Sequence, residues 1–170
     1  QDETPLTADD VAFTIQKIQD PGLKSPRQAD WSQVSVKVVS PNEIQFLLKQ
    51  PYSPFLTNTT IGIVPKHIWG NVNNDQFIFS QFNIEPIGSG PYKVEGLKRD
   101  SGGIPTVYSL ETWNKYHGMT PYISRISFLF FNDEEKALEA LDGGYIDSLP
   151  SVSATPAARP EPAPITAAHC

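Results

Sequence analysis

The chain of 170 residues carries a formal net charge of −6, and its 13 Lys and Arg residues are scattered singly among 19 Asp and Glu residues. Phosphate contacts need clustered positive charge, so we expect neither nucleic acid nor an anionic membrane surface as a partner. A lone cysteine, Cys170, excludes a disulfide within the chain and a multi-cysteine metal site, and no apolar run approaches the length of a membrane span. The start at Gln1–Pro5 lacks the basic and apolar regions of a signal peptide, so we expect a mature chain or one whose beginning is missing.

The first predicted element is a helix that starts after Thr7, a good N-cap residue, with Asp10 at the third helical position as in an acidic capping box. Residues 20–22, Asp-Pro-Gly, should end it. Alternating apolar residues then predict a hairpin of strands at 34–38 and 44–48. After it we expect short helices at 55–58 and 66–69, a short strand at 61–64, and a short helix plus loop within 71–84.

The second half of the chain predicts a further hairpin, with strands at 92–98 and 106–112 joined by a turn at 100–103. Residues 126–131 are apolar on both faces, as in a central strand. A last helix is expected at 134–141, capped by Asn132 or Asp133 and followed by Gly143. Residues 150–170 are rich in Pro and Ala without apolar periodicity, which predicts a disordered or extended tail.

Four short motifs, in order along the chain, resemble the family 5 bacterial extracellular solute-binding proteins of peptide and nickel ABC importers. They are Thr4-Pro5-Leu6-Thr7-Ala8-Asp9-Asp10-Val11, Ile63-Val64-Pro65-Lys66-His67-Ile68, Ile87-Gly88-Ser89-Gly90-Pro91-Tyr92 and Gly143-Gly144-Tyr145-Ile146-Asp147. One departure is Tyr116-His117-Gly118, where the family usually has Tyr-Trp-Gly.

The resemblance implies a mixed α and β fold, similar to a fragment of one lobe of a type II periplasmic binding protein, with a twisted sheet flanked by helices. Residues 1–85 would form part of the accessory subdomain of the first lobe, and residues 86–149 part of that lobe's sheet. Family members are several hundred residues long, so the resemblance also implies a partial chain that lacks the second lobe. Ligand would bind in the cleft between the lobes, which closes by a hinge motion.

By the same resemblance, we expect the substrate-binding component of an ABC transporter, which captures peptides or similar small solutes for import. It would be a monomer without cofactor or enzymatic activity, periplasmic or extracellular, anchored as a lipoprotein in relatives, and its closed form would be read by the membrane permease. Two alternatives remain open. One is a small self-contained interaction domain tethered by the Pro/Ala tail, and the other, a hydrolase fragment, is less favoured because no acid/base constellation is visible.

Most chemically suggestive residues have a simpler structural interpretation. The pair Asp9-Asp10 suits a helix N-terminus better than a catalytic carboxylate pair, and Asp133-Glu134-Glu135 suits an acidic first turn. Gly88-Ser89-Gly90 precedes a strand rather than a helix, which disfavours a phosphate site. The three histidines, His67, His117 and His169, lie far apart in sequence, so no metal site is predicted.

The aromatic residues in predicted loops are the remaining candidates for ligand contact. Binding residues concentrate on loops, and Trp31 is the one we single out as a ligand-binding candidate. Tyr52 and the aromatic group at 77–82 are weaker candidates, and core packing is the commoner fate for all of them. No ligand residue of the family is carried over to this chain.

Overall fold

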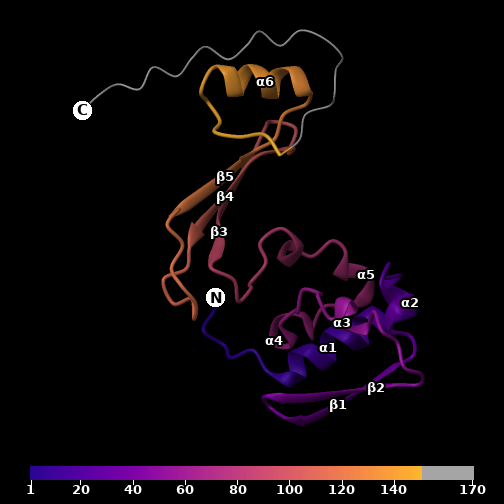
Figure 1. Ribbon diagram of the computed structural model, residues 1–170. Coiled ribbons are helices and arrows are strands. Elements are labelled where there is room, and N and C mark those ends of the chain that lie inside the picture. Colours follow the sequence, from indigo (N-terminus) through magenta and orange to yellow (C-terminus); the bar gives the residue numbers. More distant parts are fainter. Residues whose placement is uncertain (151–170) are drawn as a thin grey trace. The chain divides into compact units, whose positions relative to one another are not determined.

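A computed structural model describes residues 1–150 and shows two compact units, divided between Phe128 and Leu129. Figure 1 shows the order of the elements within each unit. The predicted tail lies outside the described residues from residue 151 onward. The predicted division near residue 85 does not coincide with the division between the two units and stays a prediction.

Helix α1 (Ala8–Gln19) begins and ends where the sequence predicts. Thr7 is in the extended conformation, and its backbone N–H donates to Oδ2 of Asp10 at 2.8 Å, so one orphan donor of the helix start is satisfied. At the other end Asp20 accepts from the N–H of Gly22 at 2.8 Å, and the chain continues as the 3₁₀ helix η1 (Pro21–Leu23). Local sequence therefore sets both ends of α1.

The predicted first hairpin consists of β1 (Val34–Ser40) and β2 (Glu43–Leu48), which pair antiparallel with Val36 opposite Phe46. The hairpin packs along α1, as Figure 1 shows, and the short helix α2 (Gln28–Trp31) also contacts α1. The buried centre is formed by Ile15, Trp31 and Val34. Around it pack Val11, Ile18, Val36, Phe46, Leu48, Phe55 and Ile61. The apolar stripe of α1 thus covers the inner face of the hairpin.

Short helices follow at α3 (Phe55–Asn58), α4 (Lys66–Trp69) and α5 (Asn74–Phe77), then the 3₁₀ helix η2 (Gln81–Asn83). The predicted strand at 61–64 is wrong. The segment has no strand partner, and its Val64 N–H instead donates to Oγ1 of Thr14 on α1 at 3.0 Å. A second aromatic group joins these turns, with the Trp69 ring 4.4 Å from Phe77 and 5.8 Å from Phe82 between centroids.

The second sheet has the order β3 (Tyr92–Arg99), β4 (Pro105–Thr112), β5 (Arg125–Leu129), and β3 and β4 form the predicted hairpin. Its turn is held by Oδ1 of Asp100, which accepts from the N–H groups of Gly102 and Ile104 at 2.8 and 2.9 Å. The expected central strand at 126–131 is instead an edge strand among the described residues. Its Phe128 is 49% exposed, and among the described residues no strand pairs with β5 on its second side.

Helix α6 (Glu134–Asp142) follows, with Asp133 as N-cap: its Oδ1 accepts from the N–H of Lys136 at 2.9 Å. The predicted glycine just past the helix end is confirmed, since Gly143 is the C-cap residue. Gly143 keeps right-handed helical geometry, and Gly144, at φ 69°, takes the left-handed conformation that turns the chain out of the helix.

The described fold is thus a mixture of helices and small antiparallel sheets, which confirms the predicted mixed fold class. Within residues 1–150, none of the helices has the length and apolar character needed to span a bilayer.

Candidate functional site

The most promising hollow among the described residues lies beside the chain's first six residues, a segment that we call the N-terminal strap (Gln1–Leu6). Its volume is about 640 Å³, and it lies wholly within the unit Gln1–Phe128. Besides the strap and Asp10, the wall is built from residues of 61–67, 87–89 and 113–117. Apolar side chains line much of it: Pro5, Leu6, Ile61, Ile63, Pro65, Ile87 and Trp113. Charged and imidazole groups join this apolar wall, which gives the hollow the mixed character of a small-molecule site.

The first strap residue is fastened to the Gly-Ser-Gly loop that leads into β3. The side-chain amide of Gln1 accepts from the N–H of Gly88 at 3.1 Å and donates to the carbonyls of Gly90 and Tyr92 at 3.2 and 2.6 Å. The amide therefore satisfies backbone groups that the turn leaves unpaired. As the sequence indicates, this loop is a turn before a strand.

The second strap residue joins helix α4. Oδ2 of Asp2 lies 2.7 Å from Nε2 of His67, and Oδ1 of Asp2 accepts from the N–H of Thr4 at 3.0 Å. Partial burial disfavours the charged carboxylate, but the bonds from His67 and Thr4 outweigh it, so the pKa of Asp2 lies below its ordinary value. The His67 and Asp2 side chains are 42% and 27% exposed, so water partly screens the pair.

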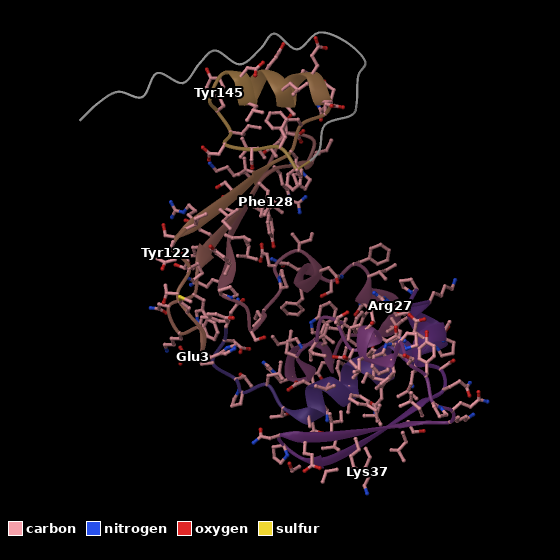
Figure 2. All side chains as sticks on the ribbon, viewed as in Figure 1. Glu3, Arg27, Lys37, Tyr122, Phe128 and Tyr145 are labelled. Atoms are coloured by element: carbon pink, nitrogen blue, oxygen red, sulfur yellow. The ribbon has the colours of Figure 1, made fainter. Side chains whose placement is uncertain are left out.

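The third strap residue points to a different partner. Glu3, labelled in Figure 2, forms an ion pair with Lys115, and the hydrogen bond and charge of Lys115 lower the pKa of the Glu3 carboxyl. Its backbone has φ 69°, the left-handed region that L-residues other than glycine seldom adopt. The turn thus allows consecutive carboxylates to reach α4 and the segment after β4, and its strain marks the strap as a place to seek function.

Asp10 connects the starts of two helices beneath the strap. Its side chain is buried, and its carboxylate accepts from the N–H groups of Thr7 and Lys66, each at 2.8 Å. Burial works against the charge, but these backbone bonds prevail and the pKa of Asp10 is lowered. Asp9 faces outward, 3.9 Å from Nζ of Lys66. The capping interpretation is therefore confirmed for Asp10, and the two carboxylates have different partners.

Trp31, the ligand-binding candidate from the sequence, lies in the core and not in the hollow. Its side chain is 1% exposed and packs edge-on against Phe46 and Phe55, at centroid distances of 5.9 and 5.7 Å. Trp31 therefore packs in the core, as the alternative interpretation expects. Ligand contact by Trp31 stays an untested prediction. Of the weaker candidates, Tyr52 is half-exposed and Phe79 is 82% exposed, whereas Phe77 packs on Trp69.

The structure brings together two histidines that the sequence separates. His67 and His117 both line the hollow, and His117 packs against the ring of Tyr116 at 4.5 Å between centroids. Within the described part of the chain no three His, Cys, Asp or Glu side chains gather as metal ligands would. His169 lies outside the described residues.

Sequence reasoning missed the residues that fasten the strap, namely Gln1, Asp2, Glu3 and Lys115. They are isolated polar residues 65 to 112 positions away from their partners, and no local pattern marks them.

Comparison with known proteins places this geometry in a family. The family model described as "Bacterial extracellular solute-binding proteins, family 5 Middle" matches residues 1–166. The oligopeptide-binding protein AppA of Bacillus subtilis is 31% identical over 150 residues, which is 86% of this chain and 27% of AppA. The chain therefore spans about a quarter of the length of this curated relative.

Solved structures agree. AppA of Bacillus subtilis in complex with a nonapeptide superposes with a TM-score of 0.74 at 31% identity, over 84% of this chain and 28% of that one. The ABC transporter substrate-binding protein CtaP of Listeria monocytogenes gives 0.71 at 35% identity, over 84% and 29%. NikZ of Campylobacter jejuni, in complex with Ni(L-His), gives 0.71 at 29% identity, over 83% and 27%. The resemblance carried by the four sequence motifs is thereby confirmed, and the chain belongs to the family 5 bacterial extracellular solute-binding proteins.

Proposed function

We propose that this chain is part of the substrate-binding component of an ABC transporter that captures peptides or similar small solutes for import. The observation that carries the proposal is the similarity to AppA of Bacillus subtilis, named as an oligopeptide-binding protein, which extends over 86% of this chain. The likeness in fold to the nonapeptide complex of AppA supports the same substrate class.

This chain by itself does not enclose a ligand as a complete binding site would. A micromolar ligand requires a binding free energy of about −8 kcal/mol, which usually needs a ligand largely enclosed by protein. The hollow beside the strap is not an enclosed cavity, and the chain covers 27% of AppA. We therefore infer that a second lobe, encoded elsewhere in the longer protein, closes over the ligand, and that ligand binding stabilises the closed form.

The remaining parts of the proposal follow from this role. The closed form would be read by an ABC permease, so the protein would act in the periplasm or outside the cell, anchored there as a lipoprotein. It would act as a monomer that binds and releases its solute unchanged, without catalysis.

The test is a thermal-shift screen of the full-length protein that contains this chain, against dipeptides, oligopeptides of up to nine residues, nickel–histidine and opine-type solutes. A specific ligand raises the unfolding midpoint by mass action, in proportion to the logarithm of its concentration. We expect a concentration-dependent rise with at least one peptide class, and the free amino acids of that peptide as a mixture serve as the control.

A rise with nickel–histidine or an opine alone would overturn the peptide assignment and leave the solute-binding role. No rise with any solute would overturn that role and favour the interaction-domain alternative. Cleavage of a peptide during incubation, followed by mass spectrometry, would contradict the non-catalytic role.

A further inference from the structure

The charged side chains that line the hollow are bound to partners within the chain. Both oxygens of Asp10 accept hydrogen bonds from backbone N–H groups. Asp2 uses one oxygen for a backbone N–H and the other for His67. Glu3 and Lys115 form an ion pair with each other. A charged group of a ligand would therefore have to compete with contacts that the protein already makes, which lowers the free energy it could gain.

The described wall buries no polar side-chain atom that lacks a hydrogen-bond partner. Within residues 1–150, the buried side-chain nitrogen and oxygen atoms without a partner are Nε1 of Trp31 and Nδ2 of Asn58, and neither residue lines the hollow. A site that selects a polar ligand group holds buried donors or acceptors for it, which stay unpaired when that group is missing. The hollow therefore does not have the wall of a site that selects its ligand by buried hydrogen bonds.

Apolar surface is what the wall leaves available to a ligand. Ile63, Ile87 and Trp113 line the hollow and are each only half-buried, and Leu6 of the strap is 54% exposed. The volume of about 640 Å³ falls in the range of about 300–1,000 Å³ that is usual for small-molecule sites. Removal of apolar surface from water is favourable by about 25 cal/mol per Å², so an apolar group placed here gains affinity without displacing any polar contact.

We propose that the hollow beside the N-terminal strap is the subsite for one large apolar side chain, aliphatic or aromatic, of the peptide ligand. The inference rests on the proposed function, because it takes peptides as the ligand class. Leu6, Ile63 and Trp113 are the side chains that contact this part of the ligand. The paired charges around them hold the strap and the wall in place and do not bind the termini of the peptide.

The experiment measures the affinity of the full-length protein, by isothermal titration calorimetry, for nonapeptides of alternating glycine and serine that carry one leucine. Nine residues is the length of the peptide in the AppA complex. The leucine is moved through the positions in turn, and the peptide without leucine is the reference. We expect leucine at one position to raise the affinity about ten- to hundredfold, because a buried leucine side chain is worth about 1.5–3 kcal/mol. Leu6→Ser should reduce this gain about three- to tenfold, since part of the apolar wall is lost.

Leu47→Ser is the matched control for this variant. Leu47 on β2 is 53% exposed, almost the same fraction as Leu6, and it does not line the hollow. The control should therefore keep the full gain in affinity. A nonapeptide with a photo-reactive leucine at the favoured position gives a second readout that needs no variant. Its cross-links, mapped by mass spectrometry, should fall within 1–6, 61–65 or at Trp113.

The possible failures of this inference and of the proposed function differ. Cross-links outside these segments, or a gain from leucine that Leu6→Ser leaves intact, would overturn the apolar subsite. Equal affinity for the peptides with and without leucine would also overturn it. In these cases peptides still bind, so the proposed function stands. No peptide binding, by calorimetry and by thermal shift alike, would overturn the proposed function and this inference with it.

Discussion

The carboxylate of Asp10 accepts a hydrogen bond from the backbone N–H of Lys66 at 2.8 Å, across 56 positions of sequence. The same carboxylate accepts from the N–H of Thr7, so one buried group closes the starts of both α1 and α4. This contact joins the first and second sequence motifs of the family, and it positions His67, the residue after Lys66, beside the strap.

Replacement of Asp10 by Asn should destabilise the protein by about 1–3 kcal/mol at neutral pH, because the amide cannot accept as a carboxylate does and places a donor against backbone N–H groups. The folded-state pKa of Asp10 is lowered, so its stabilisation is present above the unfolded value of about 3.9 and is lost as pH falls through the folded value. Urea unfolding should therefore show the gap between the two proteins narrowing below about pH 4.

The control is Asp9→Asn, next in sequence, whose exposed carboxylate should change stability by no more than about 0.5 kcal/mol. Equal losses for the two variants would contradict the assigned role of Asp10.

Trp31 offers a test that separates core packing from ligand binding. Trp31→Ala should cost about 3–5 kcal/mol in urea unfolding, because it leaves a cavity between Phe46 and Phe55. Trp31→Phe should cost less, about 1–2 kcal/mol, since the indole Nε1 has no hydrogen-bond partner to lose. With a core role, Trp31→Phe leaves ligand affinity unchanged in the full-length protein, whereas a tenfold loss of affinity would restore Trp31 as a ligand contact.

The left-handed turn at Glu3 predicts an order of stability between two variants that both lack the Lys115 ion pair. Glu3→Gly should be more stable than Glu3→Ala by about 1 kcal/mol, because glycine adopts positive φ without the Cβ clash. Thermal unfolding of the two variants side by side measures this difference. The reverse order would show that Glu3 does not hold the left-handed conformation in solution.

Replacement by alanine should change the free energy of unfolding differently at two glycines in the second sheet region. Gly103, at φ 82°, turns the β3–β4 hairpin, and alanine there should cost about 1 kcal/mol although no atom would obstruct the new Cβ. Gly90 also has open space for a Cβ, but it is not in the left-handed region, so Gly90→Ala should be neutral or stabilising by up to about 1 kcal/mol. Chemical denaturation measures both, and destabilisation by Gly90→Ala matching that of Gly103→Ala would refute the conformational explanation.

Elements whose cause is local could be predicted from sequence. The capping of α1 by Thr7 and Asp10 and the cap of α6 at Asp133 depend on residues within a few positions of one another. Each of the two hairpins joins strands that are neighbours in sequence. The same holds for the family resemblance, since each motif is a short local string. The mixed fold class was implied by that resemblance.

Features that depend on distant partners could not be predicted. Residues 61–64 have the composition of a strand. In the structure, however, the N–H of Val64 donates to the hydroxyl of Thr14 and not to the backbone of a neighbouring strand. The two-sided apolar pattern of 126–131 predicts burial on both faces, whereas Phe128 and Leu129 are 49% and 39% exposed in the described structure. The strap contacts of Asp2 and Glu3 arise only when segments more than 60 residues apart meet. The sequence therefore indicated the family, but it did not indicate which residues build the candidate site.

The import role is tested most directly by uptake of an isotopically labelled peptide, chosen as the one that most raises the unfolding midpoint of the full-length protein. Uptake is measured in cells that lack the gene and in the same cells with the gene restored. We predict that the intact labelled peptide enters only the restored cells. Equal uptake by both cell types, at peptide concentrations near the dissociation constant, would contradict a role as the binding component of an importer.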